Sequence, residues 1–106
     1  MGSPQRHAVG AAAEFLEGAI VPRTVSGVDV ILIRRLGQIQ CYLDQCSHQP
    51  IKLSEFGEIT AGRLVCHAHG GTFDLDSKGR VVCDPPVDAL TSVECAEVSG
   101  QVFVIV

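Results

Sequence analysis

Two short segments of this chain each combine a cysteine with a histidine, and this pairing restricts the possible folds more than any other feature. The first segment is residues 46–48 (CSH), and the second, after seventeen residues, is residues 66–69 (CHAH). Two thiolates and two imidazoles suit zinc, or iron with sulfide, because both metals accept soft sulfur and borderline nitrogen donors. The fold must therefore bring two loops together, and the candidate ligands are Cys46, His48, Cys66 and His69.

The spacing of these donors distinguishes a zinc site from an iron–sulfur cluster. Structural zinc sites usually pair cysteine with cysteine and histidine with histidine, whereas each segment here offers one of each. That arrangement favours a two-iron cluster in which the cysteines bind one iron and the histidines the other, as in Rieske centres. A zinc ribbon and an accidental spacing are the alternatives.

The rest of the pattern predicts an all-β domain. Three pairs of β-rich runs flank short turns: 28–33 with 39–43, 72–75 with 80–83, and 92–98 with 102–106. Residues 44–53 and 66–71 do not have strand patterns, so they are predicted to be the loops that carry the ligands. A helical turn or two is expected only within residues 8–16.

Composition limits the class of protein. The 106 residues suffice for one domain, and 46% hydrophobic residues can form a core. The net charge of −4 argues against nucleic acid as a partner. The apolar runs are strand-sized, far below the roughly 20 residues that span a bilayer, and no secretory signal is recognised. We therefore expect no membrane segment and a cytoplasmic location. Five cysteines, an odd count, favour metal binding over a disulfide scaffold.

The chain resembles the Rieske ferredoxin family over about residues 18–106. Beyond the four donors, His69–Asp74 (HGGTFD) is similar to the family's HG-x-x-F-D segment. Asp84-Pro85-Pro86, followed by Leu90, is similar to its proline loop and the strand after it. Residues 1–17 are then an N-terminal extension that is weakly structured or part of a first strand, and residues 18–106 are the Rieske domain.

The resemblance implies a Rieske fold: an antiparallel β-sandwich base with a small cluster-binding subdomain of two ligand loops. Cys46 and Cys66 would bind the inner iron of a [2Fe-2S] cluster, and His48 and His69 the outer, more exposed iron. The family's role implies a single-electron carrier between an NAD(P)H-dependent flavoprotein reductase and a terminal oxygenase. Such a chain is a component of an oxidoreductase system and has no catalytic residues of its own.

Departures from the respiratory branch of the family predict a low reduction potential. That branch has a disulfide beside the ligands. The two positions of its cysteines are here Ile51, or its neighbour Pro50, and Ala68, so no such disulfide can form. The respiratory branch also has a serine and a tyrosine that donate to the cluster sulfurs, where Gly71 and Phe73 stand here. Fewer donors stabilise the reduced cluster less, so we predict a potential near the bottom of the Rieske range of about −150 to +300 mV.

The remaining cysteines and histidines have simpler interpretations. Cys41 and Cys95 lie in apolar strand patterns, where a free thiol is predicted to behave as a small hydrophobe. Cys83 precedes the proline loop and is interpreted as structural, and His67 as a ring near the cluster that is not a ligand. The sequence leaves open the oxygenase type, the final substrate and whether the protein is a monomer or a weak oligomer. Two other functions stay open: a small subunit or detached domain of a larger oxidoreductase, and a redox-sensing module.

Overall fold

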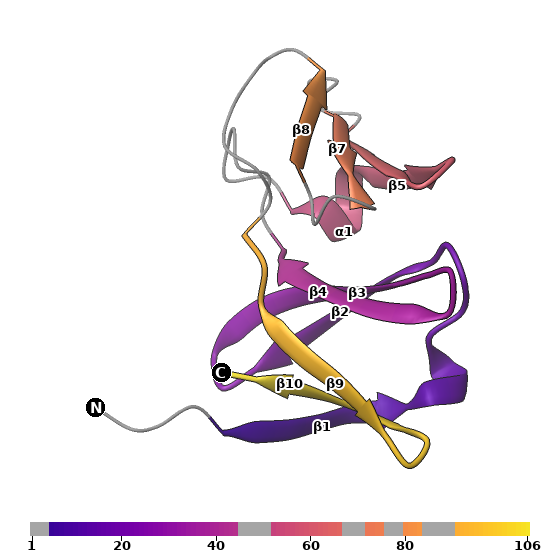
Figure 1. The fold of residues 1–106 in the computed structure, drawn as a ribbon. Helices are drawn as coiled ribbons and strands as arrows, with labels where there is room; N and C mark the ends of the chain where they lie inside the picture. The colour runs from indigo at the N-terminus through magenta and orange to yellow at the C-terminus, as the bar shows by residue number, and fades with distance from the viewer. Residues whose placement is uncertain (1–4, 45–51, 67–71, 76–79, 84–90) are drawn as a thin grey trace.

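Three small antiparallel sheets stack as layers in the computed structural model of the chain (Figure 1), which describes residues 5–44, 52–66, 72–75, 80–83 and 91–106. The bottom sheet has the order β1-β10-β9, with β1 at Arg6–Ala11, β9 at Glu94–Val98 and β10 at Gln101–Ile105. The middle sheet is β2-β3-β4, with strands Ile20–Val25, Val28–Arg35 and Gln38–Leu43. The top sheet is β5-β6-β7-β8, with strands Gly57–Thr60, Arg63–Cys66, Thr72–Asp74 and Arg80–Cys83. The predicted all-β architecture of an antiparallel two-sheet base and a separate small subdomain is confirmed.

The middle sheet is covered on both faces. In β3, four consecutive apolar residues, 30–33, are all fully buried. Their side chains alternate between two cores, because successive side chains of a strand point to opposite faces. Ile31 and Ile33 belong to the core shared with the top sheet, and Val30 and Leu32 to the core shared with the bottom sheet. One strand therefore connects the base to the subdomain.

The three predicted hairpins are present as β3–β4, β7–β8 and β9–β10. Two further hairpins, β2–β3 and β5–β6, were not predicted. The assignment of Cys66 to a loop was wrong, because this residue ends strand β6, where it lies opposite Gly57. The helix expected within residues 8–16 is one 3-10 turn at Ala12–Glu14, since residues 8–11 belong to β1.

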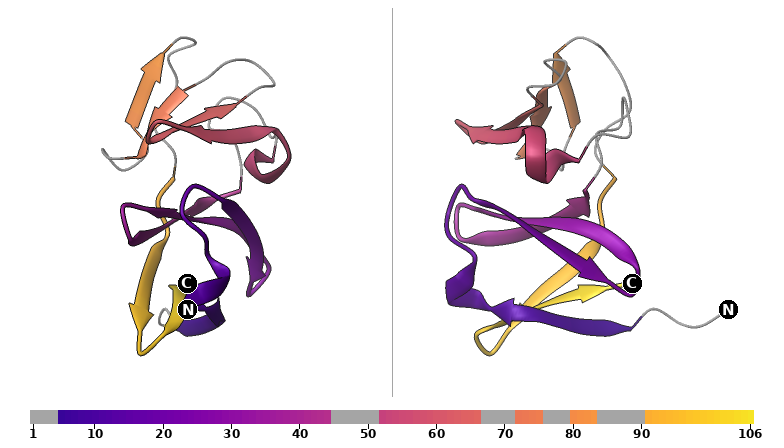
Figure 2. Two further views of the ribbon diagram at one scale, coloured as in Figure 1. Left: turned by 90° about the vertical axis from the view of Figure 1, so that its right-hand side faces the viewer. Right: turned by 180° about the vertical axis from the view of Figure 1, so that it is seen from behind.

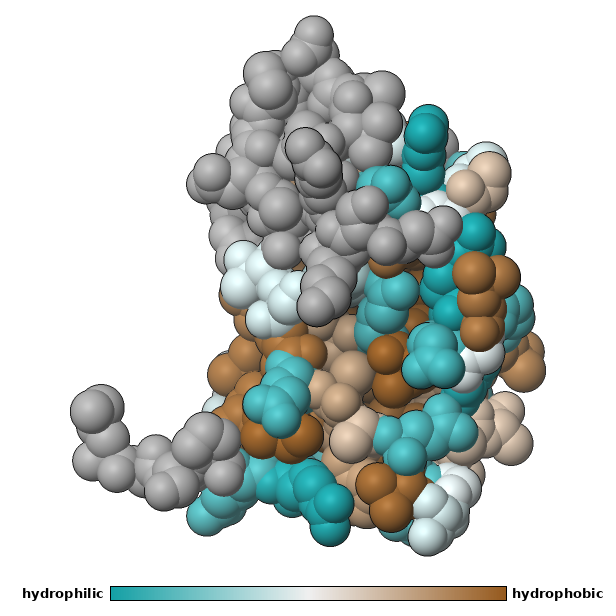
Figure 3. All heavy atoms as spheres, viewed as in Figure 1, coloured by the Kyte–Doolittle hydropathy of each residue, from teal (hydrophilic) through white to brown (hydrophobic). Residues whose placement is uncertain are grey.

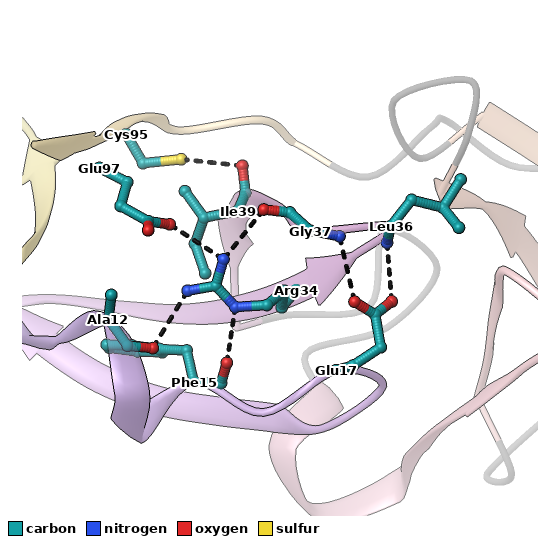
Figure 4. Close-up of polar contacts among 9 residues, drawn as sticks. All are labelled: Ala12, Phe15, Glu17, Arg34, Leu36, Gly37, Ile39, Cys95 and Glu97. Carbon is teal, nitrogen blue, oxygen red and sulfur yellow. Dashed lines mark hydrogen bonds and ion pairs between the residues drawn. The ribbon is translucent and has the colours of Figure 1, made fainter. Parts of the chain in front are cut away.

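The N-terminal segment packs on the base. β1 pairs with β10. The Arg34 guanidinium, whose side chain is 14% exposed, donates to the carbonyls of Ala12, Phe15 and Gly37 and forms a 2.9 Å ion pair with Glu97 (Figure 4). This one side chain connects the N-terminal segment, the β3–β4 turn and β9. The domain boundary at residue 18 stays a prediction.

The subdomain and the base lie at opposite ends of the molecule. Figure 2 shows the top sheet and the one-turn helix α1, Leu53–Phe56, at one end, and β1, β9 and β10 at the other. In the part of the chain that the structure describes, the helices are too short and insufficiently apolar to cross a membrane.

Candidate metal centre

Of the four predicted ligands, Cys66 lies within the described residues. It is the last residue of β6 and is fully buried. Cys46, His48 and His69 lie outside the described residues, as do His67 and the proline loop that begins at Asp84. The ligand set therefore stays a prediction. Within the described ranges, no group of three or more metal-binding side chains forms a second candidate site.

The described residues on either side of the two predicted ligand segments belong to one core. The first loop, 45–51, lies between Tyr42 and Leu53 in sequence, and the second, 67–71, between Cys66 and Phe73. All four of these flanking residues are buried, with exposures of 0–2%, and all belong to the single core between the middle and top sheets. The two loops predicted to carry the ligands therefore begin and end around one packed cluster.

The Cys66 side chain is fixed by its strand. Leu64 and Cys66 are two residues apart in β6, so they share the face that points into this core. Opposite Cys66, the backbone of Gly57 passes so close to α1 that an added Cβ would lie 2.5 Å from the carbonyl oxygen of Leu53. The sulfur of Cys66 is therefore presented from a rigid, close-packed position.

The other described thiols lie in the base. Cys41 is 3% exposed in the core between the middle and bottom sheets, where Cys95 packs against it, as predicted. Burial, with a smaller effect of Cys95, raises the pKa of the Cys41 thiol to about 12. Burial, followed by the charge of Glu94, raises the pKa of the Cys95 thiol, which donates to the carbonyl of Ile39 at 3.6 Å. Both thiols are protonated near neutral pH, and within the described residues neither belongs to a group of three or more metal-binding side chains. Cys83 ends β8, opposite Thr72.

An open groove of about 670 Å³ runs between β4 and β9. Its lining includes both base thiols and Tyr42, and it extends to Leu75 of the subdomain. Apolar side chains gather over these strands in Figure 3. Burial raises the pKa of the Tyr42 hydroxyl to about 12, and this hydroxyl donates to Gln40. The groove therefore offers thiols and a phenol that are all neutral near pH 7.

Sequence reasoning missed two polar residues beside the first loop. Asp44 is 7% exposed, the one charged side chain that is buried among the described residues, and it accepts hydrogen bonds from Ser54. The available signal was an aspartate directly after a predicted strand and two residues before a predicted ligand, followed by a serine just after the predicted ligand segment.

Comparisons with known proteins agree with this architecture. Residues 5–94 match the family model of the Rieske [2Fe-2S] domain. The ferredoxin component of the naphthalene 1,2-dioxygenase system of Pseudomonas putida is 29% identical over 75 residues, which are 71% of this chain and 70% of that protein. Protein TIC 55 of the Pisum sativum chloroplast is 44% identical over 52 residues, or 49% of this chain, but the match spans only 9% of its length.

Solved structures match over nearly the whole chain. The ferredoxin of carbazole 1,9a-dioxygenase from Nocardioides aromaticivorans IC177 superposes with a TM-score of 0.81 at 22% identity, covering 97% of both chains. A chain from the complex of reduced oxygenase and oxidized ferredoxin in carbazole 1,9a-dioxygenase gives a TM-score of 0.80 at 26% identity. That match covers 93% of this chain and 91% of the other.

Proposed function

Because the chain belongs to the Rieske [2Fe-2S] domain family, we propose that it is a ferredoxin that passes single electrons to a terminal oxygenase. The observation that carries this proposal is the match, over about 70% of both chains, to the ferredoxin component of the naphthalene 1,2-dioxygenase system. The similarity to a chain of an oxygenase–ferredoxin complex over more than 90% of each chain supports the same partner. A flavoprotein reductase that is fed by NAD(P)H would supply the electrons.

The residues fit the [2Fe-2S] cluster that the family implies. Cys66 is fully buried among apolar side chains, where a thiolate is costly unless a metal ion neutralises it. Cys46 would be the second thiolate, and His48 and His69 the imidazole ligands. When bound, the cluster accepts and releases one electron at a time. The chain would hold it through ligands from both predicted segments, and the burial of Cys66 would keep that sulfur away from water.

Matched pairs of variants test the ligand set. Cys66→Ser and Cys41→Ser each replace a buried thiol on a strand, but only Cys66→Ser is expected to abolish the cluster. His69→Asn is likewise expected to abolish the Rieske signal, whereas His67→Asn should keep it. Each protein would be reconstituted with iron and sulfide, reduced, and examined by EPR. Loss of the signal in Cys41→Ser but not in Cys66→Ser would contradict the proposal.

A reductive titration followed by EPR would measure the potential. We expect the rhombic signal of mixed His/Cys ligation near the low end of the Rieske range, because Gly71 and Phe73 offer the sulfurs no side-chain donors and Ala68 cannot form the disulfide of the high-potential branch. A midpoint above about +100 mV would contradict the low-potential assignment while leaving the cluster intact. Bound metal without this signal would make zinc the leading candidate.

One observation favours a second candidate, a domain or small subunit of a larger oxidoreductase. TIC 55 shares 44% identity with this chain over a segment that is 9% of its own length. Single-turnover kinetics would distinguish the two candidates. A free carrier is oxidised by a separately added oxygenase at a rate that rises with oxygenase concentration. A subunit transfers its electron at a rate independent of added partner and copurifies with a catalytic chain.

A further inference from the structure

Both ends of the first ligand loop are held by residues of the described structure. The loop, residues 45–51, carries Cys46 and His48, and it connects Asp44, just after β4, to Lys52, just before α1. The position of the two donors therefore depends on how firmly Asp44 is attached to the start of α1.

A two-point contact makes this attachment. The Oδ1 atom of Asp44 accepts the backbone N–H of Ser54 at 2.8 Å, and its Oδ2 atom accepts the Ser54 hydroxyl at 2.6 Å. Lys52, at the N-cap of α1, forms no capping hydrogen bond with its own side chain. The Asp44 carboxylate thus satisfies an N–H of the first turn from the opposite end of the loop.

Asp29 provides a second connection between Asp44 and Lys52, and its ion pair with Lys52 is exposed to solvent. The N–H of Asp44 donates to the Asp29 carbonyl at 2.9 Å, and the Asp29 carboxylate lies 3.3 Å from the Lys52 ammonium. The Lys52 and Asp29 side chains are 53% and 46% exposed, so water and salt screen their ion pair. The contact between Asp44 and Ser54 is partly buried, so it is screened less and is the stronger of the two connections.

This contact also links the two ligand loops. Ser54 follows Leu53, which is fully buried in the same core as Cys66. The contact between Asp44 and Ser54 consequently ties the residue before the first predicted ligand segment to the core that contains Cys66. We propose that Asp44 is a positioning residue for the [2Fe-2S] cluster, and that its contact with Ser54 sets the placement of Cys46 and His48 relative to Cys66. The inference rests on the proposed function, since it requires that these residues bind the cluster.

Three variants test the proposal on reconstituted holoprotein: Asp44→Ala, Asp44→Asn and Ser54→Ala. Asp44→Ala removes both acceptors and should speed iron release to a chelator by about tenfold or more, as loss of a group that supports metal ligands does. It should also broaden the EPR lines and shift the midpoint potential. Asp44→Asn keeps one acceptor oxygen and should lie between Asp44→Ala and the unmodified protein. Ser54→Ala keeps the backbone N–H and should have a smaller effect than Asp44→Ala.

A control separates positioning from general stability. Glu97→Ala removes a carboxylate from Arg34 in the base and should lower the apparent melting temperature. It should leave the EPR line widths, the potential and the rate of iron release unchanged. A purely structural role for Asp44 would make its variants behave in the same way.

The outcomes distinguish this inference from the proposed function. If the unmodified protein gives no Rieske signal, the proposed function and the positioning role of Asp44 are both refuted. If it gives the signal and Asp44→Ala retains the same line widths, potential and release rate, only the positioning role is refuted. Should Asp44→Ala not accumulate as folded protein, Ser54→Ala decides, because it removes one hydrogen bond and leaves the carboxylate. If Ser54→Ala then behaved like Glu97→Ala, the positioning role of Asp44 would be refuted.

Discussion

Truncation of Leu53 is expected to disturb the cluster, whereas the same truncation of Leu32 is not. Both leucines are fully buried, Leu53 in the core between the middle and top sheets and Leu32 in the core between the middle and bottom sheets. Replacing a buried leucine with alanine costs about 2–5 kcal/mol, because transfer energy is lost and a cavity remains. At roughly 4 °C per kcal/mol for a domain of this size, each variant should melt about 10–20 °C lower.

The two variants should differ in their effect on the cluster. Leu53 lies two residues after the first ligand loop and shares its core with Cys66, so a cavity there loosens the attachment of both loops. Iron release from Leu53→Ala should therefore be about tenfold faster or more. Leu32→Ala leaves this core intact and should release iron at the rate of the unmodified protein.

The assay uses holoprotein at 25 °C, with loss of the visible absorbance after addition of a chelator as the measure of cluster release. Melting followed by far-UV circular dichroism gives the stability of each variant. Because cluster loss makes unfolding irreversible, the melts are compared at one scan rate. Equal acceleration of iron release in both variants, at equal loss of melting temperature, would refute the separation of the two cores.

Three further predictions concern the frame around the site. Gly57→Ala should impair folding and cluster loading, measured as iron bound per chain, because its Cβ would lie 2.5 Å from the Leu53 carbonyl oxygen. Arg34→Met should cost about 3 kcal/mol in urea unfolding, since it leaves three carbonyls and a carboxylate without their donor, while the reduction potential stays unchanged. The pKa of the Cys41 thiol is about 12 against an ordinary value of 9.0, so the unfolded chain loses this proton first and stability should fall as pH rises from 9 towards 12. Thiol labelling near pH 8 should accordingly modify Cys95 before Cys41.

The hairpin turns show why some strands were predicted and others missed. At the β3–β4 turn, Leu36 and Gly37 both have positive φ, 53° and 78°, as the tight turns favoured in hairpins require. Ala61 and Gly62 at the β5–β6 turn have nearly the same values, 50° and 78°. The two turns therefore have the same backbone conformation. The β3–β4 turn was recognised because long apolar runs flank it, whereas β5 and β6 have only four residues each.

The sequence predicts a ligand set because metal chemistry depends on residue type and spacing, and this set stays a prediction, since three of its four residues lie outside the described structure. The contacts that support the predicted ligand segments could not be predicted from the sequence. The contact between Asp44 and Ser54 joins residues ten positions apart across a loop, and no periodic pattern marks it. Cys66 was assigned to a loop because histidine and glycine follow it, although alternation with Leu64 places it on the buried face of a strand.

The layered arrangement depends on the register of β3, which sequence patterns alone do not specify. An apolar run such as residues 30–33 indicates a strand buried on both faces, but it does not say what covers each face. In the structure, a shift of β3 by one residue would exchange the side chains of the two cores. The turn at Leu36-Gly37 fixes that register, and the Glu17 carboxylate holds the turn by accepting both of its N–H groups, at 2.7 and 3.1 Å (Figure 4). A contact at the end of the base therefore helps to determine which side chains of β3 enter the core that contains Cys66.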